Sequence, residues 1–322
     1  MHSKYLAASQ RRARSAALRL LASVALTCAV AAGCDPVLTE SPILPQNPAA
    51  ADVRSDTELR DAEGEGPGTG SMTGTWVLIH ENSSCINALG RTEEALSLTA
   101  YLLDIVQEGT QTFETWSMCA VVLSPILRLR ALVPNATTDL VTFHPVDTGH
   151  VSRAGRGGSY VSSTEVHLWG FRTSDPLRDP VPTQARDPRV EDADDDGNPG
   201  VTFLIEGGLC ERYNIQRSIS RYFGQFTTPN QIDGRSSTTT ETRVLGASSP
   251  ICNINVELAP NDPFSRFRLV RVDGEGGSLL LSGVEGQRAT CDDVRDQLDR
   301  LWTMRDADND NCSQRPRPTS ER

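Results

Sequence analysis

Aspartate residues at alternate positions are the clearest candidates for chemistry in this chain of 322 residues. Asp192, Asp194 and Asp196 lie in the segment DADDDGN at 192–198, where a glycine follows the third of them. Carboxylates at this spacing can converge on one hard cation, and glycine permits the sharp turn that convergence requires. The spacing predicts a calcium site on these three aspartates, and the alternative is a solvated acidic turn that joins two strands.

The flanking sequence separates this segment from a helix–loop–helix calcium site. Its twelfth position is Phe203 where an EF-hand has glutamate, proline-rich chain precedes it and a strand follows. The segment is more similar to the aspartate-rich calcium turns of thrombospondin-type repeats. A second segment, DADNDN at 306–311, repeats the spacing without the glycine and is a weaker candidate of the same kind.

Two arginines lie on the apolar face of a predicted strand. Arg217 and Arg221 alternate with the polar residues and would therefore share a face with Ile215 and Ile219. A buried guanidinium needs an anionic partner. The two residues are therefore candidates for binding a carboxylate ligand, with an internal Asp or Glu, or a bulge that turns them outward, as the alternatives.

Signatures of catalysis are missing from the sequence. Lysine does not occur after Lys4, which excludes a P-loop lysine, a Schiff-base lysine and a Ser–Lys dyad from the rest of the chain. No Gly-x-Ser-x-Gly or His-Glu-x-x-His pattern is present. We therefore expect a domain that binds or scaffolds and is not an enzyme. The alternatives are a hydrolase whose site is built from scattered residues, and a purely structural component.

The amino-terminal residues resemble a bacterial lipoprotein signal peptide. Five cations and no acidic residue are followed by an apolar stretch at 20–32 and then by Ala-Ala-Gly-Cys, which ends at Cys34. The resemblance implies that Cys34 becomes the lipid-bearing first residue of an exported protein held in the bacterial cell envelope, in either membrane. The alternatives are an ordinary secretory signal cut near Ala32 and an uncleaved membrane anchor.

Cysteine usage agrees with export. Six cysteines follow Cys34, an even number with no Cys-x-x-Cys pair, which predicts disulfide bonds and argues against a zinc ribbon. Six cysteines allow 15 pairings. We expect local pairing, namely Cys85–Cys119, Cys210–Cys252 and Cys291–Cys312.

Charge restricts the partners. The chain has a net charge of −11, and because residues 1–34 hold five cations and no acids, the remainder carries −16. Nucleic acid and anionic lipid surfaces both require clustered positive charge and are therefore unexpected partners. A small apolar ligand, a glycan or another envelope protein are the candidates, together with the membrane through the lipid and possible Ca²⁺ as the one cofactor.

Alternating apolar and polar residues predict a β-rich domain. Strands are expected at 75–79, 96–106, 113–122, 127–131, 166–171, 201–205, 213–223, 254–258, 267–272 and 278–283. One helix is expected from Thr290, which can cap it, with Val294, Leu298, Leu301 and Trp302 forming its apolar stripe.

The expected organisation is a signal peptide at 1–34, a disordered tether at 35–72, a β-rich domain at 73–312 and a flexible tail at 313–322. A division of the domain near the proline-rich stretch 175–199 is the alternative. The tripeptide Gly74-Thr75-Trp76 at the first strand, with a helix after the last one, resembles the lipocalins. The fold class is therefore mainly β: an antiparallel sandwich or a lipocalin-like barrel, with one C-terminal helix, stapled by disulfides.

Overall fold

The computed structural model describes residues 68–313 except 89–90, 127, 207 and 254–255. The signal peptide, Cys34 and nearly all of the expected tether lie outside this range. The strands are β1 (Gly74–Ala88), β2 (Arg91–Glu108), β3 (Gln111–Leu123), β4 (Ala131–Leu132), β5 (Thr142–Pro145), β6 (Gly149–Val151), β7 (Ser159–Val161), β8 (Glu165–Trp169), β9 (Val201–Ile205), β10 (Glu211–Thr228), β11 (Gln231–Ala247), β12 (Leu258–Pro260) and β13 (Arg266–Arg271).

Helical segments are few and short, as the mainly β prediction requires. They are α2 (Asn135–Thr138), α3 (Cys291–Asp296), α4 (Leu298–Leu301), α5 (Asp310–Ser313) and the single 3₁₀ turns η1 (Pro250–Cys252), η2 (Asp262–Phe264) and η3 (Glu275–Gly277). No helix in the described part of the chain has the length and apolar character needed to cross a bilayer.

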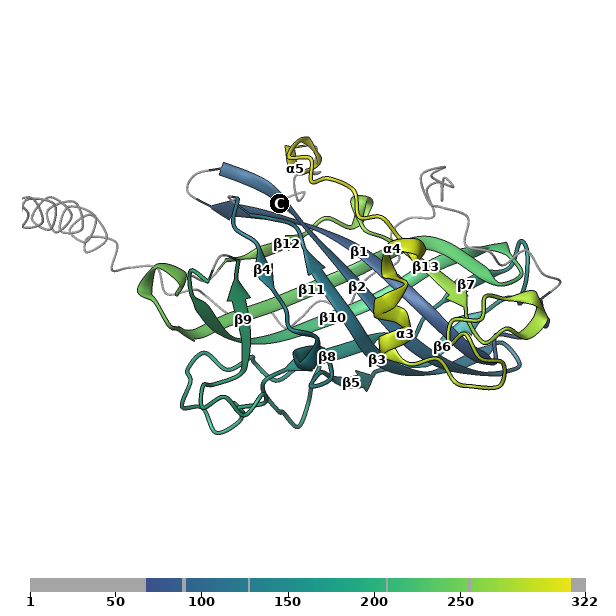
Figure 1. Cartoon of the computed structure of the whole chain (residues 1–322), viewed down its shortest axis with the longest axis horizontal. Helices are drawn as coiled ribbons and strands as arrows, with labels where there is room; N and C mark the ends of the chain where they lie inside the picture. Colours follow the sequence, from purple (N-terminus) through teal and green to yellow (C-terminus); the bar gives the residue numbers. More distant parts are fainter. Residues whose placement is uncertain (1–67, 89–90, 127, 207, 254–255, 314–322) are drawn as a thin grey trace, which may run out of the picture. The chain divides into compact units, whose positions relative to one another are not determined.

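The strand pairings close into a ring. Antiparallel neighbours follow in the order β1, β2, β3, β6, β7, β10, β11 and β13, and β13 pairs again with β1. The two longest hairpins, β1–β2 and β10–β11, form most of the wall (Figure 1). The closed ring makes the sheet an antiparallel barrel and not a sandwich, and the resemblance to the lipocalins stays a prediction. Strands before and after the stretch 175–199 share this one sheet.

Aromatic side chains fill the interior of the barrel. Trp76 of β1, Tyr101 of β2 and Tyr222 of β10 are at most 3% exposed and pack in one cluster. The Trp116 ring of β3 stacks on the Tyr222 ring at 5.7 Å between centroids, and the Tyr101 ring meets Trp116 edge-on at 5.3 Å. Barrels of eight strands are just wide enough for such filling.

The carboxy-terminal segment covers part of the outside of the barrel. The alternate residues of β1, among them Val77 and Ile79, face outward and pack against Leu301 and Trp302. The predicted cap at Thr290 is confirmed, because Thr290 and Asp293 form a reciprocal capping box at the start of α3. The predicted single helix is interrupted at Gln297, where α3 ends and α4 follows.

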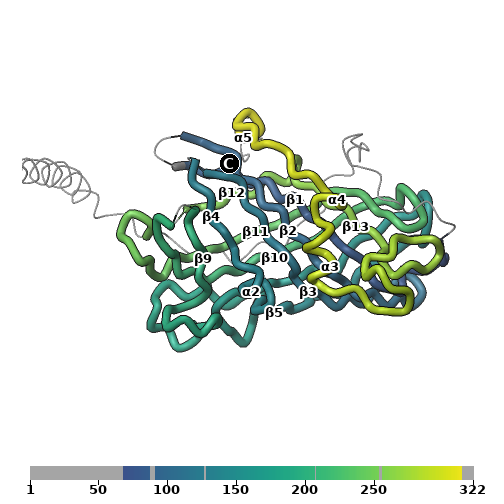
Figure 2. Tube along the Cα trace, viewed as in Figure 1, coloured from purple at the N-terminus to yellow at the C-terminus, as the bar shows by residue number. Residues whose placement is uncertain are grey.

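The disulfide bonds correct two of the three expected pairings. Cys210–Cys252 is present as expected, but the other bonds are Cys85–Cys312 and Cys119–Cys291. The expectation of local pairing was wrong because Cys85 of β1 and Cys119 of β3 lie on the barrel wall beneath residues 291–312, here named the C-terminal strap. The strap runs across this wall and is bonded to it near both ends (Figure 2). Three disulfides indicate an oxidising, extracytoplasmic compartment.

Three predicted strands are wrong, and at 254–258 only Leu258 among the described residues belongs to a strand, the short β12. At 278–283 the chain makes only an isolated bridge between Asp273 and Leu280, so the expected hairpin with β13 is not formed. At 127–131 only the last residue belongs to a strand, the two-residue β4.

Candidate functional site

The alternate aspartates come together in the loop that precedes β9. One carboxylate oxygen from each of Asp192, Asp194 and Asp196 lies within 4.8 Å of the others. The loop is shaped by bonds from the backbone amides of Asp196 and Gly197 to Asp192, and from Thr202 to Asp194 Oδ2. Ca²⁺ binds oxygens at 2.3–2.6 Å, so oxygens on opposite sides of the ion are about 5 Å apart. The separations therefore fit calcium, and Asp194 Oδ1 is a buried oxygen that accepts no hydrogen bond from the described residues.

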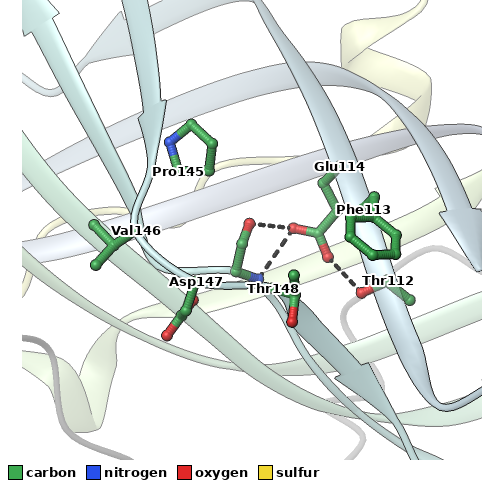
Figure 3. A pocket seen from close by; sticks show the side chains of 8 residues that line it. Thr112, Phe113, Glu114, Pro145, Val146, Asp147 and Thr148 are labelled. Atoms are coloured by element: carbon green, nitrogen blue, oxygen red, sulfur yellow. Dashed lines mark hydrogen bonds between the residues drawn. The ribbon is translucent and has the colours of Figure 1, made fainter.

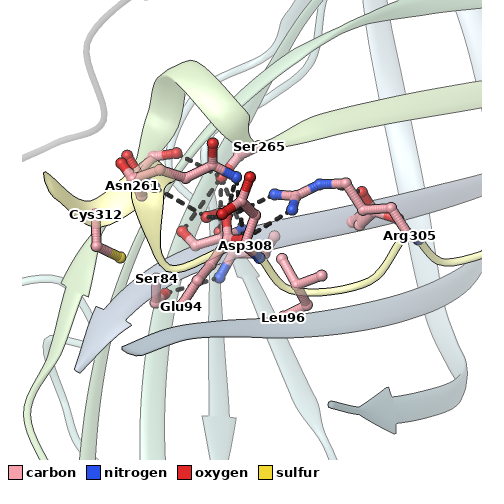
Figure 4. Close-up of polar contacts among 12 residues, drawn as sticks. Ser84, Glu94, Leu96, Asn261, Ser265, Arg305, Asp308 and Cys312 are labelled. Atoms are coloured by element: carbon pink, nitrogen blue, oxygen red, sulfur yellow. Dashed lines mark hydrogen bonds and ion pairs between the residues drawn. The ribbon is translucent and has the colours of Figure 1, made fainter. Parts of the chain in front are cut away.

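The second aspartate-rich segment serves a different purpose. Asp308 donates its backbone N–H to the carboxylate of Glu94 (Figure 4). Asn311 donates its side-chain amide to the same carboxylate. Arg305 makes two charged hydrogen bonds to Glu94, at 2.6 and 2.8 Å. Although Glu94 is 2% exposed and burial opposes its charge, the bonds from Arg305, Ser83 and Asp308 lower its pKa to about 2. Glu94 thus fastens the strap to β2.

Glu81 of β1 is a second anchor for the strap. Its carboxylate is fully buried and accepts hydrogen bonds from Trp302 Nε1 at 3.0 Å and from the backbone N–H of Arg305 at 3.1 Å. Arg266 of β13 pairs with the other oxygen at 3.0 Å. Both anchoring carboxylates are fully engaged by the protein, so this region is structural.

Arg217 and Arg221 lie on the outer face of β10, not inside the barrel. Arg217 is 1% exposed, pairs with Glu241 of β11 and donates to the carbonyls of Pro176 and Asp179. These bonds hold the loop between β8 and β9 over the sheet, which is the internal pairing that the sequence left open as an alternative. Arg221 lies 3.6 Å from Asp147 and is about one-third exposed.

Asp147 belongs to a gap in the barrel wall. β3 pairs with β6 only through Gln111 and Thr112, so further along β3 this edge is without a strand partner among the described residues. We call this gap the seam. The seam is bridged by the side chain of Glu114, which accepts hydrogen bonds from Tyr160 of β7 at 2.7 Å and from the Ser163 hydroxyl at 2.6 Å.

A groove of roughly 350 Å³ opens at the seam. We call it the seam groove, and it is lined by Thr112, Phe113, Glu114, Pro145, Val146, Asp147, Thr148 and Ser163 (Figure 3). Phe113 is 43% exposed and Val146 is equally so, which gives the groove an apolar rim. The carboxylates of Glu114 and Asp147 and the threonine hydroxyls supply polar groups beside this rim. Gly149 allows close packing here, since a Cβ on it would lie 2.5 Å from Glu114 Oε1.

Behind the groove, one serine hydroxyl lies between two carboxyl groups. Ser163 Oγ is 2.6 Å from Glu114 Oε2 and 2.8 Å from Glu165 Oε1. A hydroxyl has a single hydrogen to donate, so both contacts are hydrogen bonds only if one carboxyl is protonated. Burial, together with the nearby Glu114 and Asp147 charges, raises the pKa of Glu165 to about 8. Burial also raises the pKa of Glu114. We assign the proton to Glu165, because Glu114 already accepts from Thr112, Tyr160 and Ser163.

Two buried histidines lie inside the barrel and are neutral. His80 is hydrogen-bonded to Ser236 at 2.7 Å and to Tyr222 at 3.3 Å, and burial lowers its pKa to about 3. Burial lowers the pKa of His167 to about 3 as well. Since neither side chain lines the seam groove, we regard both as part of the packed interior.

Sequence reasoning missed Glu114, Ser163 and Glu165. The sequence did indicate that Glu114 points inward, because it lies on the same face of β3 as the buried Trp116 and Met118. Ser163 and Glu165 carried none, since β7 and β8 are short and have little alternation. Comparisons of the chain with protein-family models, curated proteins and solved structures find no match in any of the three.

Proposed function

We propose that the chain is a lipid-anchored protein of the bacterial cell envelope whose barrel binds a small polar ligand in the seam groove and does not catalyse. The observation that carries the binding proposal is the groove itself, whose lining combines the exposed Phe113 ring with the carboxylates of Glu114 and Asp147. An aromatic face with convergent hydrogen-bonding groups is the usual composition of a small-ligand site. A glycan is the first ligand class to test, because sugars offer both hydroxyls and an apolar ring face.

Binding is tested by titrating the domain with the neutral trisaccharide of N-acetylglucosamine and with 1,5-diaminopentane, while amide resonances are followed by NMR. We expect one of these probes to shift the resonances of Phe113 and Thr148, and an Asp147→Asn variant to weaken the response. Ser117→Ala, an exposed change on β3, the strand that carries Phe113, is the matched control. Saturable shifts confined to other parts of the barrel, or none with either probe, would contradict the proposal.

The lipid anchor is supported by the Ala-Ala-Gly-Cys34 sequence and by the extracytoplasmic disulfides. Replacing Cys34 with Ala removes the atom that carries the lipid, so the variant should move from the membrane fraction to the soluble fraction of the host. Cys28→Ala, within the signal peptide, is the matched control and should stay with the membrane. Retention of the Cys34→Ala protein would argue for an uncleaved anchor.

Calcium is proposed as a stabilising ion for the loop of Asp192, Asp194 and Asp196, supported by the 4.8 Å convergence of their oxygens. An ion that binds only the folded state stabilises it by mass action. Chelation should therefore lower the melting temperature, and Asp194→Ala should remove that response while Asp310→Ala keeps it. A melting temperature unaffected by chelation would identify the loop as a solvated acidic turn.

A hydrolase is the second candidate, favoured by the carboxyl pair of Glu114 and Glu165 beside a groove. A pair of carboxyl groups is what glycoside hydrolysis uses. Against it stand the four hydrogen bonds that Glu114 already accepts and the position of Glu165 behind the groove lining. Incubating the trisaccharide with the domain and analysing it by mass spectrometry separates the two, because cleavage that Glu165→Gln abolishes would identify an enzyme. A structural component without a ligand is the remaining alternative.

A further inference from the structure

The charge at the seam groove is unbalanced. The carboxyl groups of Glu114 and Asp147 line it and that of Glu165 lies behind the lining, and the Glu114 and Asp147 charges both raise the pKa of Glu165. Arg221 is the cation paired with Asp147, at 3.6 Å, and it is shared with no second carboxylate in the described part of the chain. Three carboxylates and one arginine would have a net charge of −2, and the proton on Glu165 reduces it to −1. A site that holds a proton to limit repulsion can accept another cation in its place.

The orphaned oxygen of Glu165 points to the same conclusion. Glu165 is fully buried, yet its Oε2 has no hydrogen-bond partner among the described residues. Its Oε1 contacts Ser163, which lines the groove. A buried carboxyl oxygen without a partner costs about 1–3 kcal/mol. This carboxyl lies directly behind the lining of the seam groove, next to Ser163.

We propose that the seam groove binds an organic ammonium group, whose charge replaces that of the proton held by the buried Glu165. The inference rests on the proposed function that the groove binds a ligand, and it assigns the class of that ligand. The ammonium would lie beside the Glu114 and Asp147 carboxylates, with the exposed Phe113 ring as a cation–π partner. Pro145 and Val146 offer contact to the alkyl part of an amine.

The exchange is balanced in charge. One ammonium enters, Glu165 ionises, and its proton leaves to solvent, so no covalent bond other than O–H is broken. Other ionisable groups surround Glu165. The charged ones are Glu114 of β3 and Asp147 of the β5–β6 link, which is paired with Arg221. The others are Tyr101 of β2, Tyr160 of β7, Tyr222 of β10, His167 of β8 and, beside His167, His144 of β5. The tyrosines, whose pKa values are raised, and the buried His80 and His167, whose pKa values are lowered to about 3, stay neutral between pH 6 and 9. Glu165, with a pKa of about 8, titrates in this range, and the Glu165→Gln variant separates its titration from that of Glu114, whose pKa is also raised.

Two probes of equal length separate charge from shape: 1,5-diaminopentane, whose amines stay protonated through this range, and 1,5-pentanediol, which is neutral. Calorimetry at pH 7 in two buffers of different protonation heat measures the protons released on binding. We expect the diamine to bind, to release close to one proton at pH 7, and to gain affinity as pH rises, by up to about tenfold per pH unit until Glu165 is ionised. The diol should bind at least tenfold more weakly.

Glu165→Gln distinguishes the proton exchange from simple attraction. The variant should still bind the diamine but without proton release and with little dependence on pH, whereas Asp147→Asn should weaken the affinity. Diamine binding that releases no proton from the wild-type domain, or equal binding of diamine and diol, would overturn the ammonium inference. If the neutral trisaccharide shifts the groove resonances and the diamine does not, the ammonium inference fails while the proposed function stands. If no probe binds, both fail.

Discussion

Replacing Glu165 with glutamine should make the barrel more stable, and increasingly so as pH rises. In the folded protein the pKa of Glu165 is raised from its ordinary value of 4.5 to about 8, because the side chain is buried beside Glu114 and Asp147. Between these values the native state holds a proton that the unfolded chain has released. The free energy of unfolding therefore falls by about 1.4 kcal/mol for each pH unit in this interval, and the slope disappears above pH 8.

Glutamine is neutral at every pH and can still hydrogen-bond to Ser163. The free energy of unfolding of Glu165→Gln should thus exceed that of the wild type by about 3 kcal/mol more at pH 7.5 than at pH 5. Comparing the two pH values removes any constant effect of the substitution on packing. The assay is urea unfolding with the disulfides intact, followed by tryptophan fluorescence at pH 5, 6, 7 and 7.5.

Glu285→Gln, an exposed change in the loop before α3, is the matched control and should leave the pH profile unchanged. A difference between Glu165→Gln and wild type that is constant across pH would show that Glu165 is ionised in the folded state. A difference that shrinks with rising pH would mean that folding lowers the pKa of Glu165 and does not raise it. Either result would remove the proton on Glu165, on which the groove proposal depends.

Two further predictions concern the wall around the groove and the strap. Gly149→Ala should lower the free energy of unfolding by about 1–3 kcal/mol in urea titrations, because the new Cβ would lie 2.1 Å from Thr112 Oγ1; unchanged stability would mean that the seam is loosely packed. Arg305→Ala should cost about 3 kcal/mol by the same assay, since the buried Glu94 loses its charged partner, while the exposed Arg186→Ala should cost little. Equal effects of the two arginine changes would contradict the anchoring role of Glu94.

The hairpin of β2 and β3 shows what could be predicted from the sequence. The apolar residues of both strands indicate them in the sequence, and Glu108-Gly109-Thr110 is a turn in which Gly109 has a φ of +62°. β11 shows why the rest could not. Its buried positions include Ser236, Ser237 and Thr238, so a strand that completes the barrel carries no apolar alternation at all. These residues are buried because β11 lies between β10 and β13 in the closed sheet, and that position is not visible in the residues of β11 itself.

The two candidate sites differ in the same way: one is formed by residues close together in the sequence and the other by residues far apart. The aspartate loop could be found because its three residues are neighbours in the sequence and the loop itself brings them together. The seam groove joins Glu114 of β3, the β5–β6 link and Ser163, which are up to 49 residues apart. Only the closure of the barrel brings them together. The disulfides follow the same rule, since the local bond Cys210–Cys252 was predicted and the two long-range bonds to the strap were not.

The most direct test of the proton on Glu165 is the titration of the Glu165 carboxyl carbon by NMR in the ¹³C-labelled domain, with Glu165→Gln used to assign the resonance. We expect the signal to titrate with a pKa near 8 in the free protein, and at lower pH when 1,5-diaminopentane is present. Titration near 4.5, with or without the diamine, would contradict the account, because Glu165 would then be ionised at neutral pH and no proton would lie at the seam.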